Sequence, residues 1–302
     1  MEKATSSYSD SSWSSNTVTE HNVIFCADDG YAAHLGTAIY SLLINNRGLP
    51  VTITVLTSDM SPKNQARLGK ICGNFSTPFR IEFVQEGLFS DLVLRNHLTT
   101  STYFRLLAPD FIKSQKCLYL DSDVLVVGSI AELFEYDLND YYLAAVKNPG
   151  FQGHPGLGMS PSSHYFNAGV MVMNLSKWRK HGIRNLVFEF TLANSAAILH
   201  ADQCGLNAVI DGDWLGLRDD FNLQTATRKA DETSRMQPII VHFTGNSKPW
   251  HTNNFDPFKR VYWSYRNKTP FRALLPDDFG PRVLLSRLSP RPLKKLLAKF
   301  AH

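Results

Sequence analysis

The first half of the chain alternates between short apolar runs and longer segments with helical periodicity. The apolar runs are rich in β-branched residues, which predicts strands. The intervening segments carry helix start signals, as at Ser61 and Pro62, a typical N-cap followed by a first-turn proline. The predicted strands are 22–27, 51–57, 80–84 and 117–120, and the predicted helices are 31–46, 62–73 and 101–111.

The second half of the chain contains two further apolar runs, at 165–173 and 239–243, which predict strands. Ser176 begins a predicted helix that carries Trp178 and continues to about residue 199, and residues 201–209 predict a short helix. Strands that alternate with helices form βαβ units, so the expected fold is α/β with a mixed, mainly parallel sheet.

Two carboxylates follow predicted strands directly. Asp28 comes after the strand at 22–27, and Asp121 comes after the strand at 117–120. Ligands of such sheets bind outside the carboxyl ends of the strands. The pattern therefore predicts that Asp28 and Asp121 lie at one edge of the sheet, facing a ligand.

The two ends of the chain differ in composition from the rest. Residues 1–20 are rich in serine and predict a disordered segment, residues 21–278 predict one large domain, and 279–302 form a basic apolar tail. The tail holds six cations and no acidic residue. Because the net charge of the whole chain is +4, the rest of the chain has a net charge of −2 (4 minus 6). A basic excess confined to a tail indicates a local interaction surface, not a nucleic-acid-binding face.

The tail predicts a short basic amphipathic helical segment, broken by Pro290 and Pro292. Such a segment can lie peripherally in a membrane interface, and the alternative is a helix that packs on the domain with a solvated basic face. Its cations are Arg282, Arg287, Arg291, Lys294, Lys295 and Lys299, and its apolar residues are Val283, Leu284, Leu285, Leu288, Leu293, Leu296, Leu297 and Phe300.

The cysteines and the N-terminus indicate a cytoplasmic protein. No two cysteines form a CxxC pair, which predicts reduced thiols in a reducing compartment. The N-terminus lacks the apolar core of a signal peptide, and no apolar run reaches the length of about 18 residues that spans a membrane. The cysteines are Cys26, Cys72, Cys117 and Cys204.

The segment 118–127 (LYLDSDVLVV) places Asp121 and Asp123 two residues apart between apolar strands. Carboxylates in such a setting are costly to bury unless they are paired or bind a cation. A turn would let both reach one ion, and oxygen ligands favour Mg²⁺ or Mn²⁺. The alternative is a solvated turn with two surface aspartates.

The segment 241–250 (VHFTGNSKPW) places His242 at a strand end, followed by Gly245 and Lys248. Backbone N–H groups and an ammonium are suitable donors for a diphosphate. A histidine ligand would shift the preference of a metal site from Mg²⁺ toward Mn²⁺. Alternatively, His242 is a hydrogen-bonded core residue.

Two further segments carry candidate polar residues. Asn167, Ala168 and Gly169 interrupt an apolar strand, where glycine indicates either a bulge without function or a close approach of a ligand to the backbone. Asp202 and Gln203 open a predicted helix, where Asp202 could serve only the helix dipole.

Six segments occur in an order that resembles glycosyltransferase family 8, especially bacterial lipopolysaccharide galactosyl- and glucosyltransferases. They are CADDGY (26–31), STYFRLL (101–107), YLDSDVLV (119–126), YFNAGVMVMNLSKWR (165–179), ADQCGLN (201–207) and VHFTGNSKPW (241–250). The resemblance covers about residues 22–302 and implies a Rossmann-like, nucleotide-sugar-binding domain of the GT-A type.

The resemblance also implies site roles. The metal ligands would be Asp121, Asp123 and His242, binding Mn²⁺ or Mg²⁺. The remaining residues would contact a UDP-sugar donor: Ala27, Asp28 and Tyr31 its nucleotide, Gly245 and Lys248 its diphosphate, and Arg105, Asn167, Ala168, Gly169, Asp202 and Gln203 its sugar. Ser122 would be a further donor-binding residue.

The implied reaction is retaining transfer of galactose or glucose from a UDP-sugar to a carbohydrate acceptor, such as lipopolysaccharide core or another cell-surface glycan. Gln203, in the position expected of a nucleophile, is an amide, which favours same-face attack over a covalent intermediate, with Asp202 as the alternative nucleophile. The stretch 147–164, rich in glycine and proline, predicts a loop that orders over the donor and contributes to the acceptor pocket.

Three other classes remain open from the sequence. A UDP-sugar hydrolase or nucleotidyltransferase would share the donor pocket. A non-catalytic nucleotide-sugar-binding protein would need no complete set of Asp121, Asp123, His242 and Lys248. A membrane-surface adaptor would depend on the tail alone.

Overall fold

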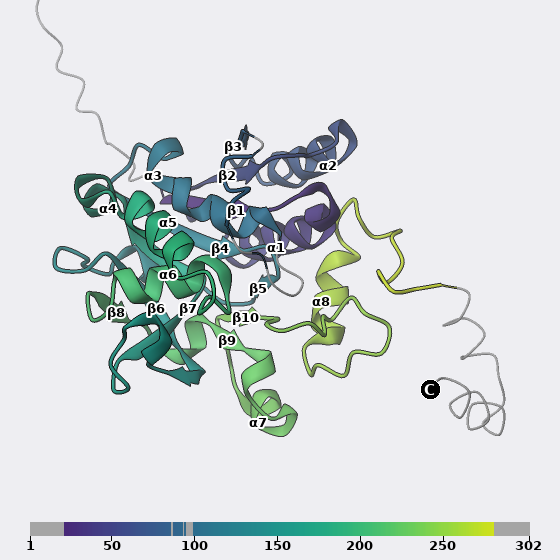
Figure 1. The fold of residues 1–302 in the computed structure, drawn as a ribbon. Coiled ribbons are helices and arrows are strands. Elements are labelled where there is room, and N and C mark those ends of the chain that lie inside the picture. The colour runs from purple at the N-terminus through teal and green to yellow at the C-terminus, as the bar shows by residue number, and fades with distance from the viewer. Residues whose placement is uncertain (1–20, 86, 93, 95–98, 281–302) are drawn as a thin grey trace, which may run out of the picture.

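A seven-stranded sheet forms the centre of the computed structural model, which describes residues 21–280 except 86, 93 and 95–98 (Figure 1). The strand order is β3-β2-β1-β4-β7-β6-β8. Strand β7 is antiparallel to both neighbours, whereas the other pairings are parallel, so the sheet is mixed and mainly parallel, as predicted. The strands are β1 (His21–Cys26), β2 (Val51–Thr57), β3 (Phe79–Phe83), β4 (Lys116–Asp121), β6 (Leu143–Gln152), β7 (His164–Asn174) and β8 (Trp214–Gly216).

Both faces of this sheet are covered, as is usual for parallel strands. Val23 and Phe25 of β1 point into a core shared with α1 (Ala32–Asn45) and α2 (Pro62–Gly73). Ile24, between them, points into a second core on the opposite face. That core is shared with three helices, which Figure 1 shows grouped together: α4 (Leu175–His181), α5 (Ile183–Ala193) and α6 (Ala201–Val209).

A smaller sheet adjoins the carboxyl end of β4. Its strands are β5 (Val124–Val126), β10 (Ile240–His242) and β9 (Leu223–Gln224), in the order β5-β10-β9. The chain passes from β4 to β5 through residues 122 and 123, and His242 pairs with Val124 in antiparallel register. The second sheet therefore brings His242 to the turn that carries the two aspartates.

Several further helices are short. Among them are the 3₁₀ helices η1 (Asp29–Tyr31), η3 (Ala131–Phe134), η5 (Asp219–Phe221) and η6 (Thr225–Thr227), and the α-helices α7 (Ala230–Arg235) and α8 (Lys259–Arg266). Helix α8 packs against α1. The sequence pattern did not predict α7 or α8.

Two of the predicted helices are wrong in their continuity. The helix expected from Ser176 to about 199 is divided into α4 and α5 at Gly182, whose φ of 61° ends the first helix in the left-handed region. The helix expected over 101–111 is a 3₁₀ helix, η2 (Thr100–Leu107), followed by the turn α3 (Ala108–Phe111). Pro109 lies in the first turn of α3, where its missing N–H is tolerated.

The loop predicted at 147–164 is also wrong in part. Strand β6 continues through Gln152, and a 3₁₀ turn, η4 (Pro155–Leu157), follows it. The pairing of β6 with β7 shifts register between Ala145 and Lys147 and again between Lys147 and Gln152. Proline and glycine are tolerated at such irregular pairings, so their presence here did not exclude a strand.

Several predictions concern parts of the chain outside the described residues. These are the disordered segment 1–20 and nearly all of the basic tail, from residue 281 onward. Within 21–280, as far as it is described, no helix is long and apolar enough to cross a membrane. The four cysteines are buried and form no disulfide, as the sequence predicted.

Candidate active site

Two hollows meet at the carboxyl ends of β1 and β4. The smaller has a volume of about 100 Å³ and is lined by Ala27, Asp28, Tyr31 and Ser122 among others. The larger, of about 390 Å³, is lined by residues of β6, β7, α6 and the loop after β10. Both hollows include Thr102, Arg105, Asp121 and Asp123 in their walls. The predicted site residues thus converge on one edge of the sheet.

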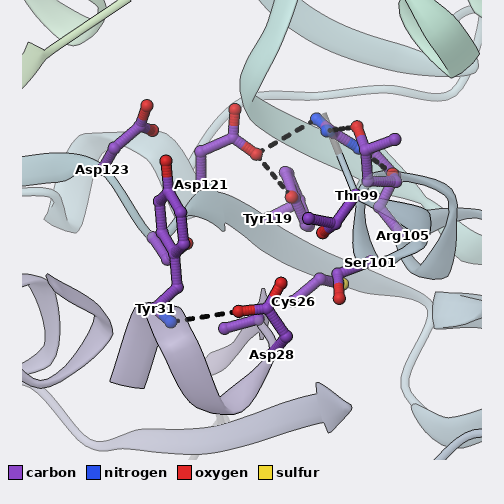
Figure 2. Close-up of a pocket in the computed structure, with 12 residues that line it drawn as sticks. Cys26, Asp28, Tyr31, Thr99, Ser101, Arg105, Tyr119, Asp121 and Asp123 are labelled. Atoms are coloured by element: carbon purple, nitrogen blue, oxygen red, sulfur yellow. Dashed lines mark hydrogen bonds and ion pairs between the residues drawn. The ribbon is translucent and has the colours of Figure 1, made fainter. Parts of the chain in front are cut away.

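Asp28 and Tyr31 form one wall of the smaller hollow (Figure 2). Asp28 caps η1 by accepting a hydrogen bond of 3.0 Å from the Tyr31 backbone N–H. The Tyr31 ring meets Trp250 edge to face, with centroids 5.9 Å apart. Burial, and then the nearby carboxylate of Asp123, raise the pKa of Tyr31, so its hydroxyl stays protonated.

Asp121, Asp123 and His242 form a compact cluster whose potential ligand atoms all lie within 4.8 Å of one another. His242 Nε2 lies 3.3 Å from Asp123 Oδ1 and 3.6 Å from Asp121 Oδ2. The opposite ring nitrogen, Nδ1, lies 3.0 Å from Asn222 Oδ1. The sequence predicted these three ligands but could not identify Asn222 as the partner of the histidine.

The second oxygen of each carboxylate is held by another side chain. Tyr119 donates a hydrogen bond of 2.5 Å to Asp121 Oδ1, and Arg105 Nη1 lies 3.3 Å from the same oxygen (Figure 2). Lys248 Nζ donates to Asp123 Oδ2 at 2.6 Å. Burial alone would raise the pKa of Asp123, but the charges of Lys248 and then His242 hold it well below its ordinary value.

These contacts leave one atom of each cluster residue directed at a shared space: Asp121 Oδ2, Asp123 Oδ1 and His242 Nε2. Two carboxylate oxygens and one imidazole nitrogen are suitable ligands for a divalent ion such as Mn²⁺. Hydrogen bonds that orient the ligands from outside are the usual second layer of a metal site. The donor set therefore fits a divalent metal ion.

Gly169 borders this cluster, and its lack of a side chain is required there. A Cβ at position 169 would lie 2.7 Å from Asp121 Oδ2 and 2.8 Å from His242 Nδ1. The sequence left open a bulge without function or a close approach of a ligand, and the structure shows that two side chains approach the Gly169 backbone. The groups that approach Gly169 are the predicted metal ligands themselves.

Arg105 and Asp202 form a buried ion pair beside the cluster, and these residues are 5% and 1% exposed. Arg105 Nε lies 2.9 Å from Asp202 Oδ2, and Nη1 donates to the Ala168 carbonyl at 2.6 Å. Thr102 Oγ1 donates to Asp202 Oδ1 at 2.9 Å. Burial raises the pKa of Asp202 to about 6, although Arg105 and Thr102 oppose this shift.

Gln203 and Asn167 are connected by amide hydrogen bonds. Gln203 Oε1 accepts from the Ala168 N–H at 3.0 Å and from Asn167 Nδ2 at 3.3 Å. Asn207, one turn further along α6, donates to the Gln203 carbonyl and exchanges two hydrogen bonds with the Phe166 backbone. These bonds join α6 to β7, and the side chains of Asn167 and Gln203 line the larger hollow.

The other predicted residues also lie at the site. Gly245, with φ of 76°, lies in the wall of the larger hollow beside Lys248. Lys248 is buried, and its ammonium also donates to the Phe243 carbonyl at 2.6 Å. The sequence reasoning missed Thr102, Tyr119 and Asn222. Thr102 and Tyr119 lie in two of the six segments that resemble the family, 101–107 and 119–126. Asn222 lies in no motif that would have indicated a site residue.

Comparisons with known proteins agree with this geometry. The model of glycosyl transferase family 8 matches residues 22–254. General stress protein A of Bacillus subtilis (strain 168) is 31% identical over 84% of this chain and 95% of its own length. Glycosyltransferase GlyF of Streptococcus pneumoniae is 30% identical over 82% of this chain, which spans 61% of GlyF.

Among solved structures, the galactosyltransferase LgtC in complex with donor and acceptor sugar analogues superposes with a TM-score of 0.75. It is 28% identical, and the match covers 85% of this chain and 98% of LgtC. The fold and the site thus define a glycosyltransferase of the GT-A type. Since the family model matches most of the sequence, this chain belongs to glycosyl transferase family 8.

Proposed function

We propose that the protein is a retaining, manganese-dependent hexosyltransferase. It would move galactose or glucose from a UDP-sugar to a carbohydrate acceptor, such as lipopolysaccharide core or another cell-surface glycan. The observation that carries this proposal is the position of the Asp121–Asp123–His242 cluster, at the junction of the two hollows. A diphosphate that joined a nucleoside in one hollow to a sugar in the other would pass this cluster.

The two hollows suit the two halves of such a donor. The smaller is walled by the Tyr31 ring and Asp28, a flat apolar surface and a hydrogen-bonding carboxylate that suit a nucleoside. The larger is walled by the polar side chains of Asn167, Asp202 and Gln203, which suit the hydroxyls of a hexose. Galactosyltransferase LgtC was solved with donor and acceptor sugar analogues, which supports the same use of this fold.

Asp121, Asp123 and His242 would hold the metal ion. When bound, Mn²⁺ would act as a Lewis acid that neutralises charge on the departing UDP. The imidazole ligand favours Mn²⁺, with Mg²⁺ as the alternative. Lys248 keeps Asp123 ionised and adds positive charge beside the place proposed for the diphosphate, where it would stabilise the leaving group.

The contacts of Asp202 and Gln203 favour same-face attack over a covalent intermediate. Asp202 is buried and engaged by Arg105 and Thr102, and the Gln203 side-chain oxygen accepts two hydrogen bonds. Neither the Asp202 carboxylate nor the Gln203 side-chain oxygen is therefore free to act as a nucleophile. In this mechanism the phosphate oxygen that leaves takes the proton of the acceptor hydroxyl. Retention of most activity by Gln203→Ala would exclude covalent catalysis by Gln203.

The first experiment is UDP release from a panel of UDP-sugars with Mn²⁺, Mg²⁺ or EDTA, for the wild-type protein and Asp123→Ala. We expect slow turnover of one donor that requires Mn²⁺ and is lost in the variant. Absence of both turnover and Mn²⁺-dependent UDP binding would overturn the proposal. Release of free sugar that no added carbohydrate acceptor reduces would indicate a UDP-sugar hydrolase instead.

The acceptor is proposed to lie beyond the donor sugar. Asn148 and Phe151 of β6, together with Thr227, also line the larger hollow. These residues come from the stretch that the sequence associated with the acceptor and from η6. A cytoplasmic enzyme held at the inner membrane face by its basic tail could reach a lipid-linked acceptor there.

A further inference from the structure

We propose that Asn222 is a positioning residue that fixes the tautomer of His242 and connects this histidine to the sugar-facing wall. Asn222 precedes β9 and is 2% exposed, and His242 is 3% exposed. The amide of Asn222 lies between two predicted site residues. Its Oδ1 is 3.0 Å from His242 Nδ1, and its Nδ2 donates to Asn167 Oδ1 at 2.9 Å.

The direction of each hydrogen bond in this chain of side chains follows from one backbone group. The Gly169 N–H can only donate, and it donates to the Asn167 side chain at 3.0 Å, so the Asn167 oxygen must be the atom there. That oxygen can accept but not donate, so Asn222 must present its NH₂ group to it. The Asn222 oxygen is therefore the atom that faces His242.

An amide oxygen accepts only, so the proton of neutral His242 must be on Nδ1. The lone pair is then on Nε2, the nitrogen that faces Asp121 and Asp123. A hydrogen bond to the remote ring nitrogen commonly sets the tautomer and orientation of a histidine that binds metal. Asn222 would therefore prepare the imidazole for a divalent ion before the ion arrives.

The same amide joins the two functional ends of the site. Asn167 receives Asn222 on its oxygen and donates from its nitrogen to Gln203 Oε1. A chain of side chains thus runs from His242 through Asn222 and Asn167 to Gln203. Displacement of Asn222 should disturb both the metal ligand and the wall proposed to contact the sugar.

The metal part of this inference rests on the proposed function, so the test has a readout that needs no metal. The ¹⁵N NMR shifts of the His242 ring in the metal-free wild-type protein report the tautomer directly. At a pH where the ring is neutral, we expect its proton on Nδ1. A neutral ring protonated on Nε2 would overturn the inference, whatever the protein binds.

A second readout is Mn²⁺ binding by the protein with UDP, followed by the EPR signal of free Mn²⁺. Asn222→Leu, which removes the acceptor, should weaken Mn²⁺ binding roughly 10- to 100-fold, the usual effect of losing an outer hydrogen bond to a metal ligand. Asn222→Asp keeps an oxygen for His242 but sets a second oxygen against Asn167. It should retain Mn²⁺ affinity close to wild type while raising KM for the UDP-sugar.

The matched control is Asn46→Leu. Asn46 is also a buried asparagine with three side-chain hydrogen bonds, to Leu42, Gly128 and Ile130, and it lies outside both hollows. Its variant should leave Mn²⁺ affinity unchanged. Equal Mn²⁺ affinity of the wild type and Asn222→Leu would overturn the role inferred for Asn222 but not the proposed function. Absence of Mn²⁺ binding by the wild type would instead contradict the proposed function.

Discussion

At the scale of single residues, the site depends on side chains that divide their atoms between two tasks. Asp121 gives Oδ1 to Tyr119 and Arg105, and leaves Oδ2 toward His242. Asp123 gives Oδ2 to Lys248 and leaves Oδ1. Because the holding contacts are already made, little reorganisation is needed before a ligand binds. Substitution of Tyr119, Arg105 or Lys248 should therefore weaken ligand binding more than it lowers the stability of the fold.

Gly169→Ala tests how closely the cluster is packed. A methyl group would overlap the Asp121 carboxylate and the His242 ring. We expect at least a tenfold loss of Mn²⁺ affinity in the presence of UDP, with about 1–3 kcal/mol of destabilisation from overpacking. Calorimetric titration and denaturant unfolding measure the two effects.

The control for this variant is Gly216→Ala in β8, where an added Cβ would have no neighbour within 4 Å. It should bind Mn²⁺ like the wild type. Wild-type affinity in Gly169→Ala would show that the cluster moves freely enough to accept a methyl group, which would contradict a rigid arrangement of the three ligands.

Asp202 should make stability depend on pH. Its pKa is raised from 3.8 to about 6 by burial. Because the folded value exceeds the unfolded one, folding favours the neutral carboxyl. The stabilising contribution is therefore complete below about pH 4 and is lost as the pH rises through about 6.

Asp202→Asn carries no titrating group, so the free energy of unfolding of the wild type relative to this variant should fall between about pH 4 and about pH 7. The difference between a pKa of 3.8 and one of about 6 corresponds to roughly 3 kcal/mol at most. Urea unfolding of both proteins across this range measures the difference. A constant difference would show that Arg105 keeps Asp202 ionised throughout.

At the scale of elements, one glycine decided where a predicted helix is divided. Hydrophobic periodicity continues across Gly182, so it predicted one helix, but the left-handed φ of this residue divides it into α4 and α5. Strand β6 shows the opposite case, since its proline and glycine lie at irregular pairings and do not end the strand. The pattern of apolar residues located many of the elements, although not β6, α7 or α8, and backbone conformation determined their limits.

Two glycine-to-alanine substitutions should have opposite effects on stability. Gly182→Ala places a side chain at φ 61° and should destabilise the protein by about 1 kcal/mol. Gly69 lies inside α2 with nothing near its missing Cβ, so Gly69→Ala should stabilise by up to about 1 kcal/mol. Denaturant midpoints measure both. Midpoints that shift equally and in the same direction in both variants would contradict the argument that backbone conformation decides the effect of each substitution.

At the scale of the whole molecule, the site forms where two sheets meet. The main sheet supplies Asp121 at the end of β4, and the small sheet supplies His242 at the end of β10. The turn through residue 123 belongs to neither sheet and carries the second aspartate. The relative position of the two sheets is therefore what assembles the cluster.

The basic tail is predicted to bind anionic membrane surfaces. Replacing its six cations by glutamine should weaken binding to phosphatidylserine-containing vesicles by more than about a hundredfold, because each cation contributes about 1 kcal/mol near such a surface. Vesicle sedimentation measures this, and neutral phosphatidylcholine vesicles are the control. The variant should retain Mn²⁺-dependent UDP release. Equal sedimentation of both proteins would favour a tail that packs on the domain.

The sequence by itself determined the class of fold and predicted most of the residues that the structure brings together at the two hollows. Apolar runs and strand-end aspartates are local patterns, and the ordered family-like segments were enough to predict Asp121, Asp123 and His242 as members of one site. These features could be predicted because each depends on neighbours along the chain or on a motif of fixed spacing.

Only the tertiary structure decided how the cluster is held. Asn222 precedes β9 and reaches His242 at the end of the neighbouring strand β10, and Arg105 reaches Asp202 from a separate 3₁₀ helix. Hydrogen bonds between residues so far apart in the chain leave no periodicity or spacing to recognise. They exist because folding buries polar groups together, where each must find a partner or lose its hydrogen-bonding energy.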